Sequence, residues 1–224
     1  MKVRYPISQE QRRTPDFRNV MPDNSASQII DLYERFASKW EADRRTTAFA
    51  EREWLDRWIA LMPPQGRVLD IGCGFGWPIA DYLISRGFAV TGIDSSPAMI
   101  TRCRELHPGH DWHVEDMRTL SSRAPFNGII AWDSFFHLSG NDQQSTFPIF
   151  RRLAAPKCTL LFTTGPEEGE AIGQLHGEPL YHASLAPDSY RALLKANGFT
   201  VREHRAEDPT CGGHTVWLAQ FEST

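Results

Sequence analysis

The sequence contains few cysteines, and none of them form a C-x-x-C pair. The four lie far apart along the 224 residues, at positions 73, 103, 158 and 211. Zinc cages and redox dithiols use closely spaced pairs, so both are disfavoured, and we expect reduced thiols in a cytoplasmic protein. We expect no metal site either, because no helix carries Asp, Glu or His at a metal-ligand spacing.

Long apolar runs and an excess of positive charge are also missing. No run approaches the ~18 residues that cross a membrane, and the charged N-terminal stretch has no apolar signal core. The net charge of −4 and the pI near 6.1 offer no general attraction to a polyanion. We therefore expect no membrane and no nucleic-acid partner.

The hydrophobic pattern begins with two helices and continues as an alternation of strands and helices. A polar tail over 1–23 precedes amphipathic helices at 25–45 and 47–62, and Pro63-Pro64 ends the second. We interpret 1–62 as a tail with cap helices and 63–224 as one core. The predicted strands of the alternation are 67–72, 89–94, 112–115, 126–132 and 159–164, and the predicted helices are 78–86, 97–106, one starting near 141 and 188–197.

This alternation predicts an α/β fold, a doubly wound parallel sheet with helices on both faces. The end of the chain departs from it. Two strand-like stretches, 199–204 and 215–221, are separated by only ten residues. Because so short a connection cannot hold a crossover helix, these two strands should pair antiparallel.

The most specific local signal is the run Asp70-Ile71-Gly72-Cys73-Gly74-Phe75-Gly76. The glycines allow a ligand to approach the backbone, and the helix that follows offers free N–H groups. The dinucleotide-binding pattern would need a glycine at position 77, where this chain has Trp77. Asp70 would repel a pyrophosphate but attract a ligand that carries an ammonium and a sulfonium. The glycines could also be ordinary turn residues.

Further acidic residues follow the next strands. Asp94 lies twenty residues after Gly74, where a carboxylate can accept both ribose hydroxyls, and Asp116-Met117 and Trp132-Asp133 follow strands three and four. Asp116 can take an adenine amino group. Because parallel strands end at one edge of the sheet, we expect these residues to line one site. Taken singly, Asp94 could cap a helix, although Ser96 is better placed, and Asp116 could be a surface carboxylate.

The series VLDIGCGFG, VTGIDSSPAMI, VEDM and GIIAWDSFFHL resembles the successive motifs of class I methyltransferases that use S-adenosylmethionine (SAM), specifically the small-molecule group. The resemblance covers about residues 65–165. It implies a Rossmann-like, seven-stranded sheet that is mostly parallel with an antiparallel last strand, N-terminal lid helices, SAM as methyl donor, and a small-molecule acceptor.

The resemblance also implies which residues bind SAM. The loop holds the methionine part, Asp94 the ribose, and Asp116 with the Met117 backbone the adenine. The expected set is Asp70, Gly72, Cys73, Gly74, Asp94, Ser95, Met99, Asp116, Met117 and Trp132, with Tyr33 and Trp40 on a lid helix. Tyr33 and Trp40, like Trp54 and Trp58, could instead be core residues.

The acceptor side is expected after strands four and five and in the last loop. The glycine-containing stretch 165–185 is too irregular for one helix and has the character of a lid. Four histidines fall in these segments, and we name His182, His214 and His137 as candidates for a general base or for orienting the acceptor. All could be structural, with proximity alone driving the transfer.

Several functions remain open at this point. The favoured one is methyl transfer to an oxygen or nitrogen of a small molecule, because the chain has Trp132-Asp133-Ser134-Phe135 where amino-methylases of DNA bases carry an Asn/Asp-Pro-Pro-aromatic turn. The alternatives are a SAM-binding regulatory subunit, an aminopropyl transferase and a NAD-dependent oxidoreductase. The last is disfavoured by Trp77 and by the antiparallel end of the chain.

Overall fold

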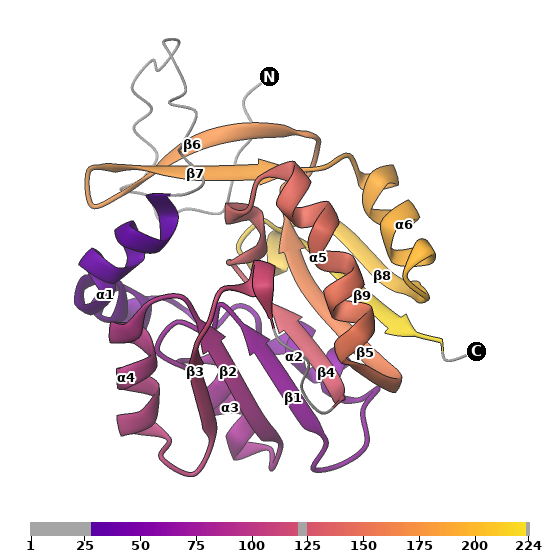
Figure 1. Cartoon of the computed structure of the whole chain (residues 1–224), viewed down its shortest axis with the longest axis horizontal. Coiled ribbons are helices and arrows are strands. Elements are labelled where there is room, and N and C mark those ends of the chain that lie inside the picture. The colour runs from indigo at the N-terminus through magenta and orange to yellow at the C-terminus, as the bar shows by residue number, and fades with distance from the viewer. Residues whose placement is uncertain (1–27, 121–124, 223–224) are drawn as a thin grey trace.

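The computed structural model describes residues 28–120 and 125–222, so the predicted tail at 1–23 lies outside the described residues. Its main feature is a seven-stranded sheet with the order β3-β2-β1-β4-β5-β9-β8 (Figure 1). Those strands are β1 (Arg67–Ile71), β2 (Ala89–Asp94), β3 (Asp111–Val114), β4 (Phe126–Ala131), β5 (Ala154–Thr164), β8 (Phe199–Asp208) and β9 (His214–Phe221). The helices are α1 (Ile29–Thr46), α2 (Arg52–Ile59), α3 (Ile79–Ser85), α4 (Pro97–Leu106), α5 (Gly140–Leu153) and α6 (Pro187–Ala196).

The sheet confirms the predicted topology. β1 pairs in parallel with both β2 and β4, while β9 pairs antiparallel with both β5 and β8. The predicted N-terminal signal of α4 is confirmed too, because the Ser96 side chain accepts a hydrogen bond from the Met99 amide and Pro97 occupies the first turn. The ten-residue connection between the predicted final strands is taken up mostly by a longer β8 and the short 3-10 helix Pro209–Cys211.

One local prediction was wrong, and one stretch has more regular structure than we expected. The second helix begins at Arg52 rather than near residue 47, after an irregular stretch that carries the buried Glu51. The stretch 165–185 is, as predicted, not one helix: β6 (Gly169–Leu175) and β7 (Glu178–Ser184) form an antiparallel hairpin with seven registered pairs. Its turn is made by His176 and Gly177, both at positive φ. The sequence did not predict these two strands, because glycines within a strand interrupt its apolar and polar alternation.

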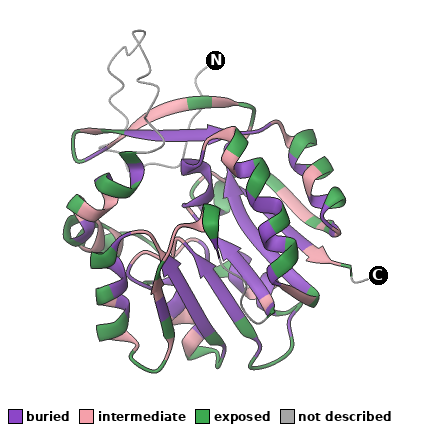
Figure 2. Ribbon diagram, in the orientation of Figure 1, coloured by how far each residue is buried: buried purple, intermediate pink, exposed green. Residues whose placement is uncertain are grey.

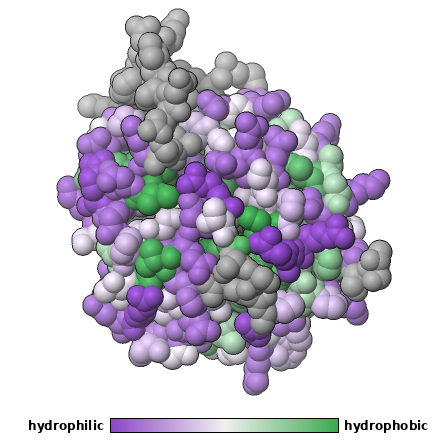
Figure 3. Space-filling model, in the orientation of Figure 1, coloured by the Kyte–Doolittle hydropathy of each residue, from purple (hydrophilic) through white to green (hydrophobic). Residues whose placement is uncertain are grey.

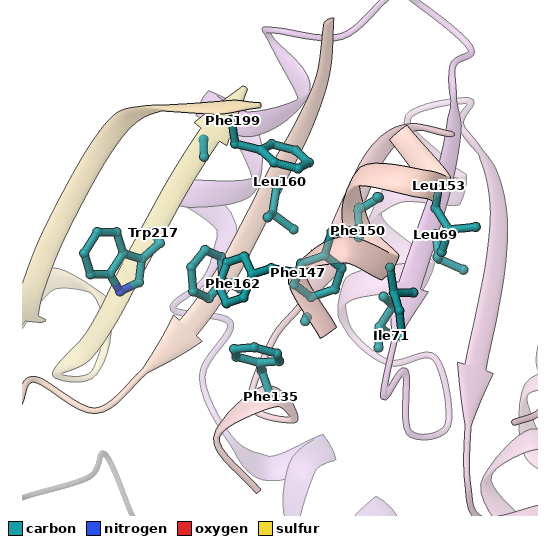
Figure 4. Packing of buried hydrophobic residues seen from close by; sticks show 14 of the residues in the cluster. Leu69, Ile71, Phe135, Phe147, Phe150, Leu153, Leu160, Phe162, Phe199 and Trp217 are labelled. Atoms are coloured by element: carbon teal, nitrogen blue, oxygen red, sulfur yellow. The ribbon is translucent and has the colours of Figure 1, made fainter. Parts of the chain in front are cut away.

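Alternation along the central strands divides the core between the two faces of the sheet. In β1, Leu69 and Ile71 join the cluster under α5 and α6, whereas Val68 joins the cluster under α2, α3 and α4. Figure 4 shows the first cluster, in which aromatic side chains from α5, β5 and β9 pack against one another. The strands are buried along most of their length, and the helices expose their outer faces (Figure 2).

A smaller layer lies over the carboxyl ends of the strands. The hairpin packs on α1 through an apolar cluster that includes Leu32, Leu175 and Leu180, and the two elements lie side by side in Figure 1. On the face shown in Figure 3, hydrophilic side chains predominate and hydrophobic groups show as separate patches. Within the described ranges 28–120 and 125–222, no helix is both long and apolar enough to cross a membrane.

Candidate active site

A cavity opens at the carboxyl edge of the sheet, beneath α1. Its empty volume is about 1210 Å³, including solvent at the mouth. The predicted residues that line it are Asp70, Gly72, Cys73, Gly74, Asp94, Ser95, Met99, Asp116, Met117, Trp132, Tyr33, Trp40 and His137. The structure therefore brings together the whole expected SAM-binding set. Asp133 lines the same cavity, whereas His182 and His214 do not appear in its wall.

The glycine loop has the close approach that its sequence predicts. Gly72 and Gly74 have φ values of 71° and 54°, and a Cβ on Gly72 would lie 2.3 Å from the Cβ of Ser134. Within the loop itself, three amides are already bonded. The Gly72 and Cys73 amides donate to the Ile93 carbonyl, and the Gly74 amide donates to Asp94. The loop is thus fixed to β2, and its ligand-binding groups are side chains and the open backbone surface.

Asp70 is the most unusual charged group of the cavity. Its side chain is 3% exposed, and within residues 28–120 and 125–222 no hydrogen bond or ion pair joins it to another side chain. Burial, with a smaller contribution from Asp94, raises the pKa of Asp70 to about 7. A buried carboxylate without a cation is costly, so the site suits a ligand that brings positive charge to it.

Asp94 and Asp116 are tied to their own strand ends. Asp94 accepts hydrogen bonds from the Gly74 amide at 3.0 Å and the Ser96 amide at 2.9 Å, one on each oxygen, which leaves a lone pair on each for a ligand. Asp116 binds Arg118 through both carboxylate oxygens. Burial raises the pKa of Asp116, but Arg118 outweighs it, so the net shift is downward. Arg118 lines the cavity and was missed by the sequence reading.

Helix α1 covers the cavity as its roof and also places the cationic side chain of Arg44 in the cavity wall. Arg44 lines the cavity and forms an ion pair with the buried Glu51, which lies in the irregular stretch before α2. Trp40 of the same helix lies over the loop, its indole nitrogen 3.8 Å from where a Cβ on Gly74 would be. The helical spacing of residues 33, 40 and 44 marks one face of α1, but only the partner Glu51 shows that Arg44 points inward.

His137 is held neutral between two neighbours. Its Nδ1 lies 2.8 Å from the Tyr181 carbonyl of β7, and its Nε2 lies 3.0 Å from the Tyr33 hydroxyl of α1. Burial lowers the pKa of His137 to about 4 and outweighs the opposite effects of the Tyr181 carbonyl and Asp133. Burial raises the pKa of Tyr33, and the carboxylates of Asp133 and Asp94 add to this effect.

His214 has the opposite character. Its Nε2 lies 2.9 Å from Asp133 Oδ1, and its Nδ1 lies 2.5 Å from the Cys211 carbonyl oxygen. Two acceptors on two ring nitrogens require both nitrogens to be protonated. Burial lowers the pKa of His214, but Asp133 and the Cys211 carbonyl outweigh it and raise this pKa to about 10. Asp133 is therefore paired with a protonated His214. The backbone of Asp133 has a φ of 50°.

His182 lies behind the cavity wall. It is 4% exposed, and its ring centroid lies 4.9 Å from that of His137. His176 stands at the hairpin turn, where its Nε2 lies 3.2 Å from the Asp43 carboxylate. Of the proposed histidines, His137 alone reaches the cavity surface. Among the described residues, no group of three or more His, Cys, Asp or Glu side chains is arranged to hold a metal ion.

Comparison with known proteins agrees with this geometry. Residues 68–157 match the family described as "Methyltransferase domain". The candidate methyltransferase YqeM of Bacillus subtilis is 32% identical over 141 residues, which cover 58% of this chain and 54% of YqeM, so the chain spans about half of that relative. An O-methyltransferase of Pyrenophora dematioidea is 25% identical over 202 residues, which cover 82% of this chain and 75% of that protein.

A solved structure shows the same fold. The 1,6-didemethyltoxoflavin-N1-methyltransferase of Burkholderia thailandensis, with 1,6-didemethyltoxoflavin and S-adenosylhomocysteine (SAH) bound, has a TM-score of 0.70 at 18% identity and covers 93% of this chain and 94% of its own. The motifs at the strand ends, the sheet order and the match over 68–157 agree with one another. Over residues 68–157 the chain is similar to the methyltransferase domain family, and its sheet has the strand order of the Rossmann-like methyltransferase fold.

Proposed function

We propose that the cavity binds one molecule of SAM and that the protein transfers its methyl group to an oxygen or nitrogen atom of a small molecule. The observation that carries this proposal is Asp70, a buried carboxylate without a cationic partner among the described residues, in a cavity that Asp94 also lines. SAM supplies a methyl group activated by a sulfonium, and its ammonium and sulfonium provide the positive partner that Asp70 lacks.

Different residues of the cavity bind different parts of SAM. Asp70 and the backbone of Gly72–Gly74 face the methionine part, with Arg44 as the cation for its carboxylate. Asp94 accepts the ribose hydroxyls, and Asp116 and Met117 face the adenine, while Ser95 and Met99 complete that wall. Trp132, Tyr33 and Trp40 enclose the sulfonium and exclude water.

The choice of oxygen or nitrogen as acceptor atom rests on the relatives. One is an O-methyltransferase, and the solved structure with the same fold is an N-methyltransferase. The chain's own residues must align the acceptor with the methyl group, exclude water and remove a proton where the acceptor carries one. Of His137, His214 and His182, the first is the candidate for the proton, because it alone faces the cavity in a neutral state.

Isothermal titration tests the binding. We expect one site per chain for SAM and for SAH, and Asp94→Ala should weaken SAM binding by ~1–3 kcal/mol through the loss of charge-assisted hydrogen bonds. Asp111→Asn, an acidic residue outside the cavity wall, should leave the affinity unchanged. Binding of NAD in place of SAM would contradict the proposal, and SAM binding without transfer to any acceptor would favour the regulatory alternative.

A further inference from the structure

The contacts of His137 determine which of its ring nitrogens carries the proton. A carbonyl oxygen only accepts hydrogen bonds, so the Nδ1 that lies 2.8 Å from the Tyr181 carbonyl must carry a hydrogen. Burial disfavours a second proton on the ring. The Nε2 is therefore an acceptor, and the Tyr33 hydroxyl 3.0 Å away donates to it.

The element that supplies the carbonyl is held in place. Tyr181 lies in β7, paired with Ile172 of β6, and the Gln143 side chain of α5 donates to the neighbouring Ala183 carbonyl at 3.0 Å. The ring of His137 thus cannot turn without breaking its bond to a fixed backbone. The phenol oxygen of Tyr33, which has given its hydrogen to His137, keeps its lone pairs for a donor in the cavity.

We propose, on the basis of the SAM-dependent activity proposed above, that Tyr33 is a catalytic residue which takes the proton of the acceptor while it passes its own proton to His137. The acceptor atom forms its bond to the methyl carbon as the carbon–sulfur bond breaks, and that bond's electron pair stays on the sulfur. The acceptor's proton moves to the Tyr33 oxygen, and the Tyr33 proton moves to Nε2 of His137, which later releases it to water.

The other histidines do not compete for this role. His214 already carries both protons between Asp133 and the Cys211 carbonyl, so it has no lone pair to offer. His182 does not line the cavity, and its ring packs against that of His137. Asp94 and Asp133 are the carboxylates that face Tyr33, and Asp133 also favours the imidazolium that forms on His137.

His137 is a weak base, so it can take a proton only from an acceptor that becomes strongly acidic during the transfer. A hydroxyl, or an N–H of a heteroaromatic ring, becomes strongly acidic as the methyl group attaches, so a weak base suffices. A primary aliphatic amine is an ammonium near neutral pH and must lose a proton before it attacks, which so weak a base as His137 cannot remove. The acceptor is therefore a small molecule that presents a hydroxyl or a ring N–H to Tyr33.

Nitrogen-15 NMR of the histidine-labelled, SAH-bound protein tests the pair without an acceptor. We expect His137 to show a protonated Nδ1 and an unprotonated, hydrogen-bonded Nε2, and Tyr33→Phe to move the Nε2 signal to that of a free imine nitrogen. Tyr82→Phe, which removes a hydroxyl that is bonded to Asp56 outside the cavity wall, is the matched control and should move nothing. If Nε2 of His137 carries a proton in this state, it cannot accept one from Tyr33, and the proposed proton transfer is wrong.

Turnover of SAM against small phenols, lactam-type heterocycles and primary aliphatic amines tests the chemistry. We expect turnover with the first two classes, and Tyr33→Phe should lower kcat ~10²–10⁴-fold while the affinity for SAH is unchanged. Unchanged kcat in that variant, or turnover confined to aliphatic amines, overturns the proposal. Failure of the wild type to bind SAM or SAH would instead overturn the proposed function, so the two failures are distinct.

Discussion

At the scale of single residues, the cavity holds ionisable groups in opposite states. Asp70 and His137 are buried where their charged forms are disfavoured, with pKa values of about 7 and about 4. Asp133 and His214 hold one another in their charged forms. Burial raises the pKa of Asp133, but His214 has the larger, opposite effect, so the net shift of this pKa is downward. A site of this kind responds to the charge of its ligand, because each shifted group can change its protonation when a charge arrives.

Proton release on SAM binding follows from Asp70. Near pH 7 the carboxyl is about half protonated, and the positive charge of SAM lowers its pKa, so binding should release up to about half a proton. Titration calorimetry in buffers of different ionisation enthalpy measures this number. Asp70→Asn should abolish the release, and Asp111→Asn should keep it. Binding heats that do not depend on the buffer between pH 6 and 8 would contradict this assignment.

At the scale of elements, α1 is fastened to the core at both sides of the cavity. Glu34 accepts hydrogen bonds from the Ser96 hydroxyl and from the Ala98 amide, which lies 3.1 Å away at the start of α4. On the other side, Tyr33 binds His137. The hairpin β6–β7 backs α1 without lining the cavity, so the roof over the site is α1 itself.

The hydrogen bonds of Glu34 to Ser96 and Ala98, which we call the Glu34 latch, can be tested separately from the chemistry. Glu34→Ala removes two hydrogen bonds between α1 and the start of α4, each worth about 1 kcal/mol, and should weaken SAM binding because α1 is then held less firmly over the cavity. Hydrogen exchange in α1 should become faster in the same variant. Glu53→Ala, on the exposed side of α2, is the matched control. If α1 keeps its slow exchange in Glu34→Ala, the latch is not what holds the roof.

At the scale of the whole molecule, the Asp133–His214 pair joins the end of β4 to the start of β9, residues 81 positions apart. The pKa of His214 is raised to about 10, so the folded state binds a proton that the unfolded state loses above pH 6.5. This contribution to stability is fully present below pH 6.5 and is lost as the pH rises through about 10.

Urea unfolding between pH 6 and 10 measures this linkage. The free energy of unfolding of the wild type should fall relative to that of His214→Gln by an amount on the order of 3 kcal/mol across this range. His176→Gln, which breaks a more exposed pair with Asp43, should keep the pH dependence of the wild type. Parallel curves for the wild type and His214→Gln would show that the pair does not carry the linkage.

The sequence by itself determined the sheet and the placement of the residues that line the cavity. Alternation with a period of two, the glycine loop and the acidic strand ends are local patterns, and parallel strands bring their carboxyl ends together whatever the surrounding packing. The fold, the antiparallel end of the chain and the similarity to methyltransferases over 68–157 were therefore predictable, and the structure placed Asp70, Asp94 and Asp116 in one cavity.

Only the tertiary structure decided the roles of the histidines and the nature of the roof. Tyr33 and His137 are 104 positions apart, and no local pattern shows that they share a hydrogen bond. The sequence ranked His182 and His214 beside His137 because all three fall in segments near the same edge. Burial behind His137 and pairing with Asp133 then set them apart, since a histidine's protonation depends on its neighbours in space rather than along the chain.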